Sequence, residues 1–95
     1  MRERFIERKF VEAVKKKGGF APKFVSPGLD GMPDRIVLFP IGKIAFVELK
    51  APGEMMRPLQ VRRKRQLKEL GFLVYCVDDV SQIDGVIREI GGDAR

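Results

Sequence analysis

The 95-residue chain contains no histidine and a single cysteine, Cys76. Without histidine there can be no histidine general base, no Ser–His–Asp triad, no Cys₂His₂ zinc finger and no histidine-ligated metal. One cysteine excludes a disulfide within the chain and any metal site built from a cysteine cluster. Any metal site must therefore be made of oxygen ligands.

Long apolar runs are also missing. The longest uncharged apolar run covers residues 71–77, well short of the roughly 18–20 residues that span a membrane. The first residues are rich in charge and contain no apolar signal region. We therefore expect a soluble protein of a reducing, cytoplasmic compartment with no membrane partner.

What the chain has in excess is positive charge. Its 19 Lys and Arg against 13 Asp and Glu give a net charge of +6. Such a domain is attracted to polyanions, either nucleic acid or an acidic membrane surface, and charge alone does not choose between them. The hydrophobic share of 44% predicts an ordinary globular protein, and the length predicts one domain, residues 1–95, with a modest core.

Apolar periodicity and turn residues predict three helices and four strands. The expected helices are 2–17, 58–70 and 80–90, and the expected strands are 23–25, 34–39, 43–50 and 72–77. The two central strands show little alternation, so both faces of the sheet should be covered. The order predicts an α/β fold in which one mixed sheet is flanked by helices.

Charged residues interrupt the apolar pattern at the end of the strand 43–50. Alternate residues of a strand share a face, so Glu48 and Lys50 point the same way, after Ile44 and Phe46. A carboxylate on such a face is costly to bury unless a cation or hydrogen bonds compensate it. A functional site explains this placement, and the alternative is an ordinary ion pair where the strand meets solvent.

The turn before this strand sets the register of the hairpin. Pro40 and Gly42 fit a type I turn with a three-residue loop in which Gly42 is left-handed. Counting back along both strands then places Asp34 opposite Glu48, with Cβ atoms about 4.5–5.5 Å apart. Two carboxylates at that distance repel unless a divalent cation lies between them. A two-residue loop would instead put them on opposite faces.

Two carboxylates in a chain without histidine form a hard-oxygen site, suited to Mg²⁺ or Mn²⁺. Such an ion can activate water and neutralise charge on a phosphoryl oxygen. Lys50 would orient the water or stabilise the developing charge.

The first helix offers a further acidic residue. Glu7 lies about 50° from the centre of the apolar stripe, which makes it a candidate ligand or, alternatively, a salt-bridge residue. Glu3 also faces inward, but at a fraying end.

The helix 58–70 is strongly basic, with five cations in seven residues. They are Arg62, Arg63, Lys64, Arg65 and Lys68. Without a polyanion these charges repel one another, which favours phosphate binding over a merely solvated face. Arg57 and Lys23 are two further candidate contacts for nucleic acid. Gln60, near the helix start, could hydrogen-bond the attacking water, Lys50 or a phosphate oxygen.

Three motifs at this spacing resemble the VRR-NUC family of the PD-(D/E)xK nuclease superfamily. They are Gly-Met-Pro-Asp at 31–34, Phe-Val-Glu-Leu-Lys at 46–50 and Gln-Val-Arg-Arg at 60–63. The resemblance runs from about Ile6 to Tyr75 and implies a restriction-endonuclease-like αβββαβ core. The helix 80–90 lies outside that core and could serve dimerisation or cover the sheet.

The resemblance also implies Mg²⁺- or Mn²⁺-dependent cleavage of DNA. On it, Asp34, Glu48 and the backbone carbonyl of Leu49 become metal ligands, and Lys50 lies beside the attacking water. Gln60 supports the site, and Glu7 is the acid of the first helix. Free-standing members of this size resemble junction-resolving homodimers of phages or bacteria, so the cytoplasm of a bacterial or phage-infected cell is expected. The alternatives are a non-catalytic nucleic-acid-binding module and a structural domain with an incidental motif.

Overall fold

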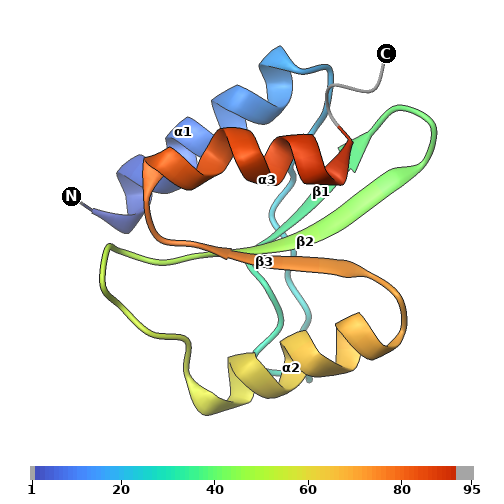
Figure 1. Cartoon of the computed structure of the whole chain (residues 1–95). Helices are drawn as coiled ribbons and strands as arrows, with labels where there is room; N and C mark the ends of the chain where they lie inside the picture. Colours follow the sequence, from blue (N-terminus) through green and yellow to red (C-terminus); the bar gives the residue numbers. More distant parts are fainter. Residues whose placement is uncertain (1, 92–95) are drawn as a thin grey trace.

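The computed structural model describes residues 2–91 and contains a three-stranded mixed sheet (Figure 1). Its strands are β1 (Arg35–Phe39), β2 (Lys43–Leu49) and β3 (Leu73–Val77), in the spatial order β1-β2-β3. β1 pairs with β2 antiparallel, and β2 pairs with β3 parallel. The parallel pair needs a crossover connection, which the helix between its strands provides.

Helices cover both faces of this sheet. α1 (Glu3–Lys16) and α3 (Ile83–Ile90) lie side by side on one face, and α2 (Pro58–Glu69) lies on the other (Figure 1). A short 3₁₀ turn, η1 (Val80–Gln82), precedes α3, so the helix expected over 80–90 begins in the tighter form. The α/β class and the mixed sheet are confirmed. No helix among residues 2–91 is long and apolar enough to cross a membrane.

Local sequence explains where the helices form. α1 buries Ile6, Phe10 and Val14 at four-residue spacing, which places them on one stripe facing the sheet. α2 begins at Pro58, whose missing N–H and fixed φ suit the first helical position. It ends before Gly71, whose φ of 98° is accessible to glycine at little cost.

The strand expected over 23–25 is replaced by a longer irregular segment beside β1. Residues 20–24 run along the free edge of β1 and form isolated bridges, Phe20 with Leu38 and Lys23 with Arg35. Pro22 lies between the bridges and has no N–H to donate, which prevents a continuous ladder. The short strand expected over 23–25 is therefore not formed, and isolated bridges take its place.

The hairpin loop has the expected length but not the expected turn type. Phe39 pairs with Lys43, which confirms the three-residue loop, and Gly42 is left-handed with φ 71°. Ile41 also has a positive φ of 68°, whereas a type I turn requires a negative φ there. Ile41 therefore adopts a conformation that costs a non-glycine residue about 1–2 kcal/mol.

Candidate active site

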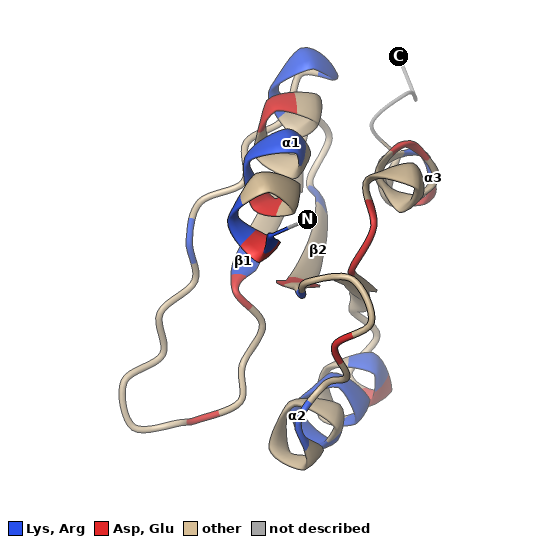
Figure 2. Cartoon of the chain, turned by 90° about the vertical axis from the view of Figure 1, so that its left-hand side faces the viewer, with Lys and Arg blue, Asp and Glu red and all other residues tan. Residues whose placement is uncertain are grey.

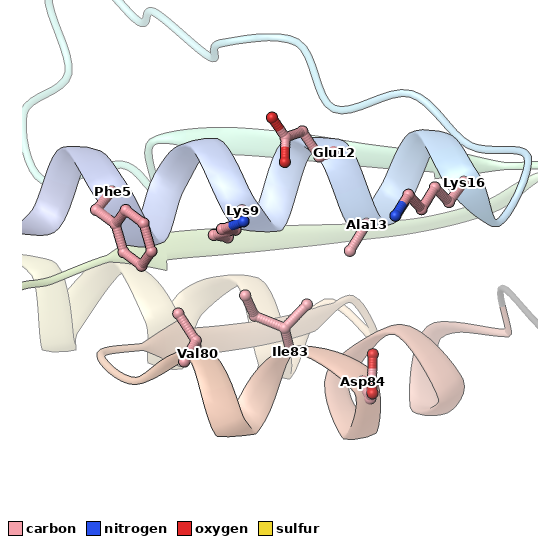
Figure 3. Close-up of a pocket in the computed structure, with 8 residues that line it drawn as sticks. All are labelled: Phe5, Lys9, Glu12, Ala13, Lys16, Val80, Ile83 and Asp84. Carbon is pink, nitrogen blue, oxygen red and sulfur yellow. The ribbon is translucent and has the colours of Figure 1, made fainter.

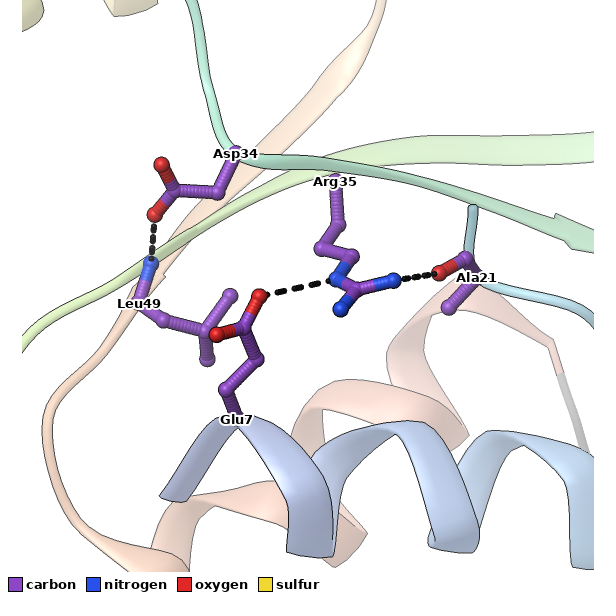
Figure 4. Close-up of polar contacts among 5 residues, drawn as sticks. All are labelled: Glu7, Ala21, Asp34, Arg35 and Leu49. Atoms are coloured by element: carbon purple, nitrogen blue, oxygen red, sulfur yellow. Dashed lines mark hydrogen bonds and ion pairs between the residues drawn. The ribbon is translucent and has the colours of Figure 1, made fainter. Parts of the chain in front are cut away.

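The register of the β1–β2 hairpin brings two acidic side chains together at one end of the sheet. The ladder runs to the pair Arg35 and Val47, so Asp34 and Glu48 follow one step beyond it. The carboxylate of Asp34 accepts a hydrogen bond of 2.9 Å from the backbone N–H of Leu49 (Figure 4). The predicted convergence of the two acidic residues on adjoining strands is confirmed; their catalytic roles stay a prediction.

Glu48 is a buried carboxyl with one oxygen left unpaired. Only 2% of the residue is exposed. Its Oε2 accepts from the side chain of Gln60 and lies 3.5 Å from Nζ of Lys50, while Oε1 has no hydrogen-bond partner. Burial and the nearby charge of Asp34 raise the pKa of Glu48 to about 7, against the opposing effect of Lys50. An unpaired buried carboxylate oxygen beside a second carboxylate fits a cation.

Gln60 is fixed at both ends of its amide group. Its Oε1 accepts a hydrogen bond of 2.8 Å from the backbone N–H of Arg57, at the start of α2, and its Nε2 donates to Glu48. Its partner is Glu48 rather than the suggested Lys50, and a bond to the attacking water or to a phosphate stays a prediction. Gln60 therefore couples the first turn of α2 to the orientation of Glu48.

Lys50 is held beside Glu48 by the neighbouring strand. Its backbone N–H donates to the carbonyl of Val77, the last residue of β3, at 2.9 Å. Its side chain is only 12% exposed, so the ammonium group lies close to the acidic pair rather than in bulk solvent. Glu48 and Lys50 thus form an ion pair, as the simple alternative predicted, but within a buried acidic site.

Glu7 is committed to a different ion pair. Its carboxylate accepts from Nε of Arg35 at 3.0 Å, and Nη1 of Arg35 donates to the carbonyl of Ala21 at 2.8 Å (Figure 4). The salt-bridge alternative for Glu7 is what the structure shows, with a partner from β1. Glu7 nevertheless lines a pocket of about 240 Å³ together with Asp34, so its role as a ligand stays a prediction.

Glu3 is the first-helix acid that interacts electrostatically with both sheet carboxylates. Its pKa is raised by burial and by the charge of Asp34, and Glu3 in turn raises the pKa of Glu48. It also lines the pocket with Asp34 and Glu7. Sequence reasoning set Glu3 aside as part of a fraying end. Glu3 and Glu7 are four residues apart and therefore lie on the same side of the helix. This spacing was the sequence feature that could have identified Glu3 as a second acidic residue near the site.

The donor set suits an ion that retains much of its hydration. Within residues 2–91 no group of three or more acidic or cysteine side chains is arranged to hold a metal. Mg²⁺ is commonly bound by one or two carboxylates, with waters and substrate phosphates completing its shell. Asp34 and Glu48 meet that requirement, and ligation by the Leu49 carbonyl stays a prediction.

Arg63, expected on DNA, is engaged within the protein. Its Nε donates to the carbonyl of Asp30 and its Nη1 to the side chain of Gln66, both at 2.9 Å. A Cβ on Gly31 would lie 2.8 Å from Cγ of Leu59. The loop that precedes Asp34 is therefore packed onto α2. The other proposed contacts on α2 and its cap, Arg57, Arg62 and Lys64, lie at or near the surface.

Comparison with known proteins decides the family. No family model matches the chain. It is 52% identical over 85 residues to "Putative nuclease p44" of Acyrthosiphon pisum secondary endosymbiont phage 1, covering 87% of this chain and 91% of that protein. A solved structure described as a VRR_NUC domain superposes with a TM-score of 0.84 at 30% identity, over 90% of this chain and 94% of the other.

The chain belongs to the VRR-NUC family. The resemblance drawn from the three motifs is therefore confirmed. In this VRR-NUC chain the motifs meet in space: the loop to Asp34, the end of β2 with Glu48, and the first turn of α2 with Gln60 adjoin one another.

Proposed function

We propose that this VRR-NUC protein is a divalent-metal-dependent endonuclease that hydrolyses DNA phosphodiester bonds. The observation that carries the proposal is the buried Glu48, with one unpaired carboxylate oxygen, between Asp34 and the ammonium group of Lys50. A module that only binds DNA gains nothing from acidic groups that repel phosphate. The nuclease name of the phage relative supports the same activity.

The residues divide the work of hydrolysis as follows. Asp34 and Glu48, with the Leu49 carbonyl, would hold Mg²⁺ or Mn²⁺, which when bound supplies an activated water and neutralises phosphoryl charge. Lys50 donates hydrogen bonds to the attacking water and to the phosphoryl oxygens as charge develops on them. Gln60 restrains the Glu48 carboxylate in one orientation, because its amide is itself fixed by the start of α2.

The surface around these groups binds the substrate. Arg57, Arg62, Lys64 and Lys23 supply cations for the sugar–phosphate backbone, with Arg63 restricted to the donors that its internal bonds leave free. Contacts of this kind position DNA without reading its sequence. Specificity is therefore expected to come from the shape of the DNA.

We further propose that the enzyme acts on branched DNA as a homodimer. One chain carries one candidate site, so symmetric cutting of two strands at a junction requires two copies related by a twofold axis. The last helix and the hairpin edge, where Ile41 is 87% exposed, are the two candidate interfaces. The phage origin of the relative supports action in the cytoplasm of a phage-infected bacterial cell.

The test is a cleavage assay on four end-labelled substrates: a four-way junction, a flap, a single strand and a linear duplex. The wild-type protein should cut at least one of them, the junction best, with Mg²⁺ or Mn²⁺ and not with EDTA. Asp34→Asn and Lys50→Ala should abolish cutting while DNA binding persists. Glu69→Gln, which changes an exposed carboxylate nine residues after Gln60 at the end of α2, is the matched control and should cut normally. Binding without cutting at any metal concentration would favour the non-catalytic module.

A further inference from the structure

α1 separates two grooves whose charges differ. On the side facing the segment 20–24 and β1, a groove of about 450 Å³ is lined by five cations and two carboxylates. The cations are Arg4, Arg8, Lys15, Lys23 and Arg35, and the carboxylates belong to Glu7 and Glu12. We call this the 20–24-side groove. It has an excess of positive charge although Arg35 is neutralised by Glu7.

The groove on the other side of α1 provides an internal comparison. It lies between α1 and α3, has a volume of about 390 Å³ and an apolar floor that includes Val80 and Ile83 (Figure 3). Its charges are balanced, because Lys9 and Lys16 are matched by two carboxylates, those of Glu12 and Asp84. The excess of cations is thus confined to one flank of the same helix.

The 20–24-side groove leads to the candidate active site. Glu7 and Lys23 line it and also line two further hollows that follow towards the N-terminal end of α1. The last of these is bounded by Asp34. Adjoining hollows that share Glu7 and Lys23 therefore lead from Lys15 to Asp34. In Figure 2 the acidic ends of β1 and β2 lie between the basic residues of α1 and those of α2.

Apart from Arg35, which is paired with Glu7, the cations of this groove are not held by carboxylates of the described part of the chain. Within residues 2–91, Arg4, Arg8, Lys15 and Lys23 form no ion pair. Arg4 and Arg8 are four residues apart on the helix, an arrangement of like charges that destabilises an isolated helix. An anionic ligand in the groove would offset this repulsion.

Building on the proposed nuclease function, we propose that the 20–24-side groove binds the backbone phosphates of one DNA strand as it approaches the cleavage site. From Arg4 to Lys15 the helix advances about 16 Å at 1.5 Å per residue. Consecutive phosphates of one B-DNA strand rise about 3.4 Å along the axis but lie about twice as far apart through space, so the groove is long enough for about two or three. DNA would then be held by α2 on one side of the carboxylate pair and by α1 on the other.

The test compares two double variants of α1 that remove the same charge from its two flanks. Arg8→Gln with Lys15→Gln alters the 20–24-side groove, and Lys9→Gln with Lys16→Gln alters the opposite flank. All four residues are exposed, and Arg8 and Lys9 lie at similar distances, 5.5 and 5.6 Å, from the Phe5 ring. Equal melting temperatures would verify that both variants fold.

Binding to a fluorescent DNA junction is measured by anisotropy from 50 to 200 mM salt, with EDTA present. Loss of two phosphate contacts should reduce the slope of log affinity against log salt by about 1.8, and weaken binding at 50 mM by about tenfold or more. The opposite-flank variant should retain the wild-type slope. Equal effects of the two variants, or no effect of Arg8→Gln with Lys15→Gln, would overturn the groove proposal.

The same proteins separate this proposal from the nuclease proposal. Binding is measured without divalent metal, so the difference in DNA affinity between the two double variants does not depend on whether the protein cuts DNA. A wild-type protein that shows the predicted difference in binding but cuts no DNA with Mg²⁺ or Mn²⁺ would support the groove and contradict the nuclease activity.

Discussion

The two faces of the sheet differ in what they bury. On the α1 and α3 side, thirteen buried residues form one cluster, and every one of them is apolar. On the α2 side, within the described residues 2–91, only Phe46, Leu67 and Val74 form a buried apolar cluster, and the same side buries Glu48 and Gln60. β2 contributes to both faces by alternation, with Val47 on one and Glu48 on the other. The α1 and α3 side therefore contributes most of the stability, whereas the α2 side buries polar side chains of the candidate site in place of apolar ones.

The largest effect on stability should come from the α1 and α3 side. Phe10→Ala removes a fully buried ring and should lower the free energy of unfolding by about 3–5 kcal/mol. Phe20→Ala makes the same chemical change at a residue that is 61% exposed. It should lower the free energy of unfolding by much less than Phe10→Ala does. Urea denaturation measures both. Equal costs would contradict the burial of Phe10 in the core of the α1 and α3 side.

Glu48 should make the metal-free protein less stable as the pH rises. Because the pKa of Glu48 is about 7 in the native state and 4.5 is its ordinary value, the native state binds more protons than the unfolded state between these pH values. Stability is then fully present below pH 4.5 and declines towards pH 7, by no more than about 3 kcal/mol. Glu48→Gln should remove this decline and abolish cleavage. Denaturation curves recorded with EDTA at several pH values measure this decline. If the free energy of unfolding changes with pH in the same way in the wild-type protein and in Glu48→Gln, Glu48 is not the group responsible.

Removing the amide that links α2 to Glu48 should affect both stability and activity. Gln60→Ala deletes a cap of the helix and the donor to a buried carboxylate, at a cost of about 1–2 kcal/mol. Cleavage should slow at temperatures where the variant is folded. Gln66→Ala, at an exposed position of the same helix, breaks only the surface hydrogen bond from Arg63; it should change stability by less than about 0.5 kcal/mol and should slow cleavage much less than Gln60→Ala does. A Gln60→Ala enzyme with full activity would show that Glu48 needs no such restraint.

The smallest effect is expected at the hairpin, far from either core. Ile41→Asn places a residue that tolerates a positive φ where the backbone requires one. It should raise the free energy of unfolding by about 1 kcal/mol. A loss of stability in thermal unfolding would mean that the exposed Ile41 side chain makes a compensating contact.

Sequence reasoning succeeded where the determinants were local. Pro40 and Gly42 fixed the loop length, and the loop length fixed the register that places Asp34 beside Glu48. Strand alternation then put Lys50 on the same face as Glu48. Most helix and strand ends agree within one or two residues because prolines and glycines mark them.

Contacts between distant segments could not be predicted in the same way. The bond from Gln60 to Glu48 and the attachment of Arg63 to the carbonyl of Asp30 depend on how α2 packs against the sheet and the loop. The coupling of Glu3 to Asp34 depends on where α1 crosses the end of β1. None of these placements follows from local spacing, since each joins segments that only tertiary packing brings together.

Isothermal titration calorimetry with Mn²⁺ tests most directly whether Asp34 and Glu48 share one cation. Wild-type protein and the control Glu69→Gln should bind the ion with equal affinity, while Asp34→Asn and Glu48→Gln should each lose most of that binding. Both variants binding Mn²⁺ as tightly as the wild-type protein would contradict the account.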